Sequence, residues 1–80
     1  MGNHQRAARC YQQARVHWQQ YGDPYYEANS LIRLGENHHA TGDSGAAQES
    51  WREALSLLEQ VSHPDAARVR AMLDGLTLSQ

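Results

Sequence analysis

The stretch LIRLGENHHATGDSGAAQESWREAL, residues 31–55, decides the fold. It consists of two segments whose apolar residues recur at helical spacing, separated by the pair Gly42-Asp43. Glycine readily adopts the left-handed conformation that ends many helices, and Asp43 or Ser44 can cap the helix that follows. We therefore predict two helices joined by a tight turn, and so short a turn forces them to run antiparallel.

The chain repeats itself when it is shifted by forty residues. The shift superimposes small and large residues that recur at steps of four and three, as on one face of a helix. Alanines at such spacing let one helix approach another closely, while bulky residues fill the space beside them. The matched positions are Ala7 and Ala47, Tyr11 and Trp51, Ala14 and Ala54, Trp18 and Leu58, Tyr21 and Val61, and Pro24 and Pro64. Trp18 and Trp51 are accordingly assigned to the core.

Proline marks two further helix starts, in Asp23-Pro24 and His63-Pro64. At the first position of a helix its missing N–H costs nothing, and Asp23 is a good N-cap. Together with the central turn, these starts predict helices over residues 4–21, 24–40, 44–60 and 64–77. The predicted fold class is therefore all-α, a single domain over residues 1–80 built of antiparallel helix hairpins.

The composition limits what a chain of this size can do. Its 80 residues carry a formal net charge of −2 and include no Phe and one cysteine. So small a core cannot enclose a large enzyme cavity, and the intermixed charges do not create a field that attracts nucleic acid or anionic lipid. Cys10 cannot form an internal disulfide, and no apolar run approaches the roughly 18 residues of a membrane span. We expect a cytoplasmic protein without a membrane segment.

The forty-residue unit carries a spaced set of residues, namely Leu34-Gly35, His38, Gly42-Asp43, Ala47, Trp51 and Ala54. In this order and spacing they resemble the pattern of the tetratricopeptide repeat. The resemblance implies a right-handed superhelix, with a full repeat over residues 24–61, half a repeat over 4–21 and a terminal helix over 64–77. The forty-residue period is also similar to the repeats of actinobacterial multidomain transcriptional regulators. It indicates that the chain is a segment of such a regulator.

The last predicted helix departs from the repeat. Leu31 and Leu34 fall on Ala71 and Asp74 forty residues later, so the apolar face of the earlier helix is not reproduced. The apolar stripe of this helix is instead Val69, Met72, Leu73 and Leu76. We expect that the helix either rotates to pack as a terminal cap or meets a surface outside the chain.

The resemblance implies binding rather than catalysis. In helix-pair repeats the first helix of each pair lines a concave groove, which holds an extended peptide or a partner helix. Carried onto residues 24–40, the groove-facing positions are Asn29, Ile32, Arg33, Glu36, His39 and Ala40. The implied function is a non-catalytic scaffold without a cofactor or metal, whose partner is a protein, a peptide or another domain of the parent chain.

Self-association is an alternative to this scaffold. Arrays of such repeats usually need three or more units to bury their ends, and this chain has about two. Tyr25, Tyr26, Met72 and Leu76 are candidates for contacts between copies through the terminal helices. The protein would then be a helical bundle with no external ligand.

Metal, enzyme and DNA-binding functions are weaker alternatives. His38 and His39 invite a zinc site, but adjacent helical residues point about 100° apart and no further cluster completes one. Serines, histidines and acids are present without a nucleophile motif such as GxSxG. Arg6, Arg9 and Arg15 lie on one predicted helix and raise the possibility of a small DNA-binding domain. Arginines on a helix surface are usually solvated, which disfavours a nucleic-acid partner.

Overall fold

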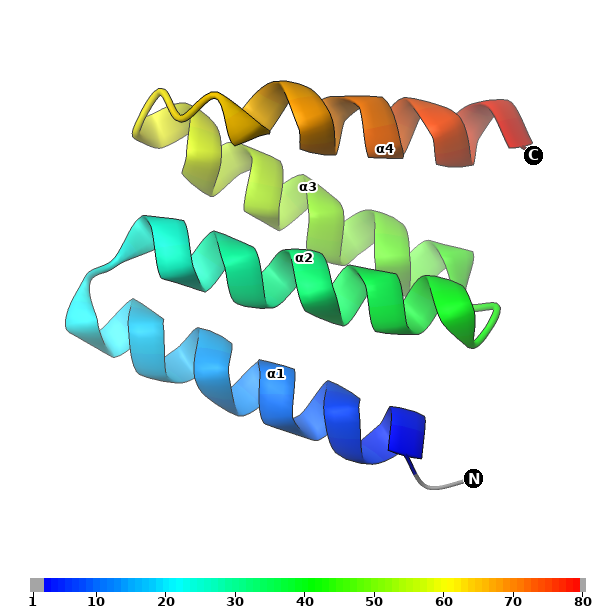
Figure 1. Cartoon of the computed structure of the whole chain (residues 1–80), viewed down its shortest axis with the longest axis horizontal. Helices are drawn as coiled ribbons and strands as arrows, with labels where there is room; N and C mark the ends of the chain where they lie inside the picture. Colours follow the sequence, from blue (N-terminus) through cyan, green and yellow to red (C-terminus); the bar gives the residue numbers. More distant parts are fainter. Residues whose placement is uncertain (1–2, 80) are drawn as a thin grey trace.

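Residues 3–79 form four helices in the computed structural model, and side chains are described through residue 76 (Figure 1). The helices are α1 (Asn3–Tyr21), α2 (Pro24–Ala40), α3 (Ser44–Gln60) and α4 (Asp65–Ser79). No strand occurs within residues 3–79, so the predicted all-α fold is confirmed. The ends of the predicted domain, residues 1–2 and 80, lie outside the described residues.

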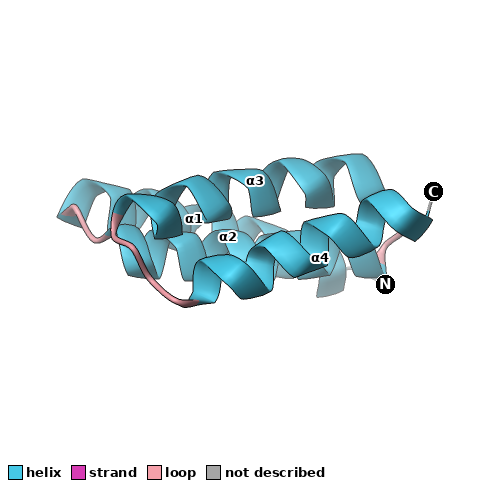
Figure 2. Cartoon of the chain, turned by 90° about the horizontal axis from the view of Figure 1, so that it is seen from above, coloured by secondary structure: helices cyan, strands magenta, loops and turns pink. Residues whose placement is uncertain are grey.

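Consecutive helices run antiparallel, and each packs mainly on its neighbours in the sequence (Figure 1). The result is a slab with extents of 32 × 29 × 14 Å rather than a closed bundle. Figure 2 shows that α3 and α4 are offset from each other along the shortest axis of this slab. Because α1 and α4 each have one principal neighbour, each keeps a face that no other described helix covers. Between residues 3 and 79, none of the helices has the length and apolar character needed to cross a bilayer.

The first two turns of the chain use the same backbone hydrogen bonds. A glycine just past the helix end has a positive φ, 73° at Gly22 and 85° at Gly42. The N–H of Asp43 donates to the carbonyl of His38 at 2.9 Å, and that of Gly42 donates to the carbonyl of His39 at 3.1 Å. This pair of bonds defines a Schellman motif, which satisfies the last carbonyl groups of a helix. The predicted left-handed role of Gly42 is confirmed.

Aspartate side chains cap the helices that follow these two turns. The Asp23 carboxylate accepts the N–H of Tyr26 at 3.2 Å, and the Asp43 carboxylate accepts the N–H of Ala46 at 3.1 Å. Pro24 lies in the first turn of α2, as predicted. Helix α2 is therefore closed at both ends, which fixes its length and direction.

The turn between α3 and α4 repeats this geometry without a glycine. Ser62 adopts a φ of 52°, and the N–H of His63 donates back to α3 at 2.9 Å. Helix α4 begins at Asp65 rather than at Pro64, the predicted first position. Pro64 lies instead in a tighter turn, where the His63 carbonyl accepts the N–H of Ala66 at 3.1 Å. The His63 ring replaces the aspartate cap, because its Nδ1 accepts the N–H of Asp65 at 3.0 Å.

The core is centred on Trp51, as predicted. Its indole is 4% exposed, and the Nε1–H donates to the carbonyl of Ile32 at 3.0 Å. The ring packs directly over Gly35, where a Cβ would come closer than 3.0 Å to three ring atoms. The other buried apolar residues are Ala28, Leu31, Ile32, Leu34, Ala47, Ala54, Leu58, Val69 and Leu76. The Leu34-Gly35 pair and Trp51 thus form one contact that brings α2 and α3 together.

Trp18 lies outside this core, which corrects its assignment from the repeat. The side chain is half-buried and stacks on Tyr26 with ring centroids 4.7 Å apart. It also contacts Tyr21, whose side chain is 74% exposed. Its counterpart forty residues later, Leu58, is buried because α3 packs between α2 and α4. No described helix covers α1 on the corresponding side.

The apolar stripe of α4 faces α3. Val69 and Leu76 are buried, and Met72 and Leu73 are half-buried against the core. The helix is therefore rotated relative to the forty-residue pattern, and the first of the two predicted arrangements is the one observed. Its exposed residues include Ala67, Arg68, Ala71 and Asp74.

Candidate protein-binding surface

Helix α2 presents an exposed stripe opposite its buried face. The buried residues of the helix are Glu27, Ala28, Ser30, Leu31, Ile32, Leu34 and Gly35. Asn29, Arg33, Glu36 and Ala40 recur at steps of four, three and four, so they lie on one side of the helix. Asn29 is half-buried and the other three are exposed. These four residues are called the α2 stripe below.

Two of the six predicted groove residues lie beside this stripe rather than on it. Ile32 is 4% exposed and packs in the core, which corrects its prediction as a groove residue. Its place on α2 turns it toward α3, where its carbonyl also accepts the Trp51 indole N–H. His39 is exposed, and its ring centroid lies 5.9 Å from that of Trp51. His39 therefore borders the stripe on the α3 side.

Arg33 and Glu36 are exposed charged residues of the α2 stripe. Within the described residues neither side chain makes an ion pair or a side-chain hydrogen bond. Because the two residues are three positions apart on a helix, they are neighbours on its surface. The α2 stripe thus offers one cation and one anion about one helical turn apart.

Arg15 has a structural role that the sequence did not reveal. From α1 its guanidinium reaches Glu53 of α3, with Nη2 and Oε2 2.8 Å apart, and Glu27 of α2, with Nε and Oε2 4.0 Å apart. Arg6 and Arg9 are exposed on α1. One of the three arginines in the DNA-binding alternative is therefore engaged in ion pairs that join three helices.

The two adjacent histidines have different surroundings, as helical spacing predicts. His38 is half-buried and lines a hollow of about 260 Å³ between α1 and α2, together with His4 and Asn37. His39 is exposed. Across the described part of the chain, no three or more His, Cys, Asp or Glu residues are grouped so that they could hold a metal ion.

The candidates for self-association are only partly accessible. Tyr25 and Tyr26 are 36% and 46% exposed. Met72 is half-buried against the core, and Leu76 is 7% exposed. Leu76 is therefore corrected from a candidate interface residue to a core residue, because the rotation of α4 turns it toward α3.

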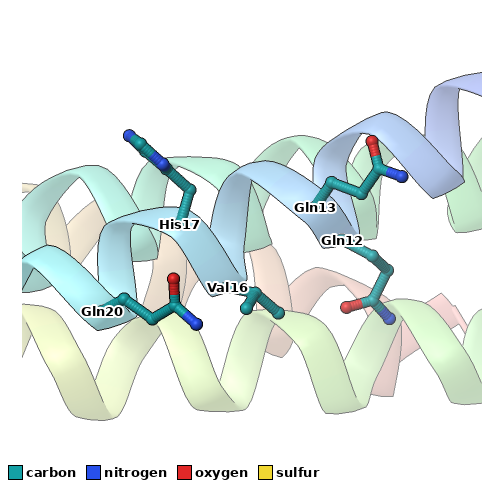
Figure 3. Close-up of a pocket in the computed structure, with 5 residues that line it drawn as sticks. All are labelled: Gln12, Gln13, Val16, His17 and Gln20. Atoms are coloured by element: carbon teal, nitrogen blue, oxygen red, sulfur yellow. The ribbon is translucent and has the colours of Figure 1, made fainter.

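One hollow on the described surface is an open face of α1. It measures about 350 Å³ and is lined by Gln12, Gln13, Val16, His17 and Gln20. All five residues come from one helix, and their side chains splay apart instead of converging on an enclosed volume (Figure 3). This hollow lacks the walls that a ligand site needs.

Comparison with known proteins agrees with this geometry. Residues 1–73 match the sequence profile of the tetratricopeptide repeat. The chain is also similar to the Regulatory protein AfsR of Streptomyces griseus, with 38% identity over 53 residues, or 66% of the chain. It covers 5% of that protein. No solved structure is significantly similar to the chain. With its antiparallel hairpins and the Gly35–Trp51 contact inside the matched region, the chain belongs to the tetratricopeptide repeat family.

Proposed function

We propose that the chain is a non-catalytic protein-interaction segment, in which the α2 stripe and His39 dock an extended peptide or a helix of a partner protein. The observation that carries the proposal is an exposed, mixed-charge stripe on a helix whose opposite face is buried. Charges held on such a helix select partners by the position of complementary charges. Tetratricopeptide repeats generally mediate contacts between proteins, which supports this function.

The parent protein in this proposal is a cytoplasmic bacterial transcriptional regulator. The likeness to a regulatory protein of Streptomyces griseus supports that context, and the chain covers 5% of the length of that protein. In a long regulator, the docked partner is either a separate protein or another domain of the same chain. Either partner needs the same accessible stripe on α2.

The proposal is tested by reversing the two charges of the stripe. The wild-type chain is used to select binders from a library of random peptides, and the selected peptides are then measured against the double variant Arg33→Glu with Glu36→Arg. We expect at least a tenfold loss of affinity, because each charge of the peptide then faces a like charge. Titration calorimetry measures the affinity, and circular dichroism checks that the helix content is unchanged.

A matched control is available on α3. Glu49 and Arg52 are exposed, lie three residues apart and carry the same two charges. The variant Glu49→Arg with Arg52→Glu also leaves the net charge unchanged, and we expect it to bind like the wild type. If the α2 variant retains full affinity, the stripe is not the docking surface.

Self-association is a second candidate, favoured by exposed aromatic residues at one end of the molecule. Tyr25 and Tyr26 contact each other, and Tyr25 also contacts His63, with ring centroids 5.4 and 4.6 Å apart. A homo-oligomer built through this end would melt at a temperature that rises with protein concentration. A melting temperature independent of concentration would count against it.

A further inference from the structure

A small pocket lies beside the α2 stripe, between α2, α3 and α4. Its volume is about 270 Å³, and it is lined by His39, Trp51, Met72, Gly75 and Leu76. Because His39 borders the stripe, the pocket is continuous with the surface proposed above for docking. The volume is below the roughly 300–1,000 Å³ of sites for small molecules and cofactors. It suits a single side chain.

The lining of the pocket favours an apolar occupant. Trp51, Met72 and Leu76 supply aromatic, thioether and aliphatic surface. The Trp51 N–H is already bonded to the carbonyl of Ile32, so it gives a ligand no donor. Among the described residues that line the pocket, His39 is the one that offers a side-chain polar group. A polar side chain entering here would lose hydrogen bonds to water that the pocket hardly replaces, whereas an aliphatic side chain has none to lose.

Gly75 is an independent sign that this space is kept open. Glycine inside a helix is less stable than alanine, so its presence within α4 calls for a reason. At Gly35, forty residues earlier, the reason is packing, because a Cβ there would overlap the Trp51 ring. At Gly75 a Cβ would meet nothing within 4 Å, so packing within the described chain does not require glycine. Because Gly75 has no side chain, the side of the pocket formed by α4 stays open at this position.

We propose that this pocket, called the Gly75 pocket below, receives one leucine or methionine side chain of the peptide that lies along α2. The inference rests on the proposed function and names its partner class: an extended segment with charges that complement Arg33 and Glu36 and an aliphatic residue beside His39. Leucine and methionine carry no branch at Cβ, so their ends can reach the Trp51 ring from a peptide backbone on α2. The methionine thioether also packs favourably on aromatic rings.

The pocket is tested with a probe too small to span the stripe. N-acetyl-L-leucinamide is titrated into the chain while NMR follows the Trp51 indole N–H and the Met72 methyl group. We expect saturable shifts of both signals. N-acetyl-L-alaninamide should bind at least about tenfold more weakly, because most of the buried hydrocarbon is missing. Shifts that do not saturate, or equal affinities for the two probes, would overturn the proposal.

Two substitutions of the same glycine sharpen this test. In Gly75→Leu the new side chain fills the pocket, so binding of the leucine probe should be abolished. In Gly75→Ala the added methyl group fills only part of the pocket, so binding of the probe should be weakened. The matched control is Ala67→Leu, because Ala67 is exposed on the same helix and does not line the Gly75 pocket. It should bind like the wild type. Undiminished binding by a folded Gly75→Leu variant contradicts the assignment.

The probe also separates this inference from the proposed function. The Arg33 and Glu36 reversal should leave binding of N-acetyl-L-leucinamide unchanged, because the probe does not reach those charges. If the probe binds but no peptide is selected, the Gly75 pocket stands and the docking function fails. If selected peptides bind equally well after their leucine and methionine residues are replaced by alanine, the docking function stands and the pocket assignment is wrong.

Discussion

Gly35 and Trp51 meet across the α2–α3 interface with no room for a methyl group between them. The indole can lie so close to the α2 backbone only because position 35 has no side chain, and the same closeness lets its N–H reach the carbonyl of Ile32. Gly35 therefore determines both how the Trp51 ring packs and whether its Nε1–H can form a hydrogen bond. The two effects cannot be separated by a substitution at position 35.

Replacing Gly35 by alanine should destabilise the fold despite the better helix propensity of alanine. Overpacking costs about 1–3 kcal/mol, whereas the gain in propensity is about 1 kcal/mol. Urea unfolding followed by Trp fluorescence measures the difference. Gly75→Ala is the matched control, because it makes the same change in a helix without a clash, and we expect it to stabilise by about 0.5–1 kcal/mol. Equal effects at both positions would contradict the packing argument.

At the scale of helices and turns, most of the structure follows from local sequence. Asp23-Pro24 and Gly42-Asp43 mark turns whose hydrogen bonds involve only nearby residues, so the helix bounds were predictable. The rotation of α4 was predictable as one of two arrangements, because its apolar stripe is out of phase with the repeat. The left-handed conformation of Ser62 was not predictable, because serine has no special preference for that conformation.

The α3–α4 turn should be the easiest element to stabilise. Ser62 has a φ of 52° in a position that Gly22 and Gly42 occupy in the other two turns. A residue with a Cβ is strained there by about 1–2 kcal/mol, and a glycine would remove this strain. Glycine also has more conformational freedom in the unfolded chain, which offsets part of the stabilisation. We expect Ser62→Gly to raise the free energy of unfolding by about 0.5–1 kcal/mol. A thermal melt tests this, and no change or a loss would show that Ser62 is not strained.

Across residues 3–76, contacts between neighbouring helices hold the molecule together, and the ion pairs of Arg15 also link α1 to α3, which is not its neighbour in the sequence. Arg15 links α1 to both α2 and α3 through Glu27 and Glu53, and Glu27 is only 8% exposed. The sequence could not reveal this contact, because Arg15 and Glu53 are 38 positions apart. Likewise, the half-buried state of Trp18 depends on which helices cover α1, and no local pattern encodes that.

Removing Arg15 should therefore cost more than removing an arginine from a surface pair. Arg15→Ala leaves the Glu27 carboxylate buried without its cationic partner, which we expect to cost about 1–3 kcal/mol. Arg70→Ala is the comparison, because Arg70 pairs with Glu59 and both side chains are at least half exposed. Such a surface pair contributes below about 1 kcal/mol. Both variants are compared by urea unfolding, and equal losses would mean that Arg15 acts only at the surface.

The three turns recur every twenty residues, at positions 22, 42 and 62, and share one backbone geometry. Genetic recombination between any two of these junctions would add or delete complete helices and would leave the chain path across each joint unchanged. The shared turn geometry thus allows the gene to gain or lose complete helices, whatever residues those helices contain.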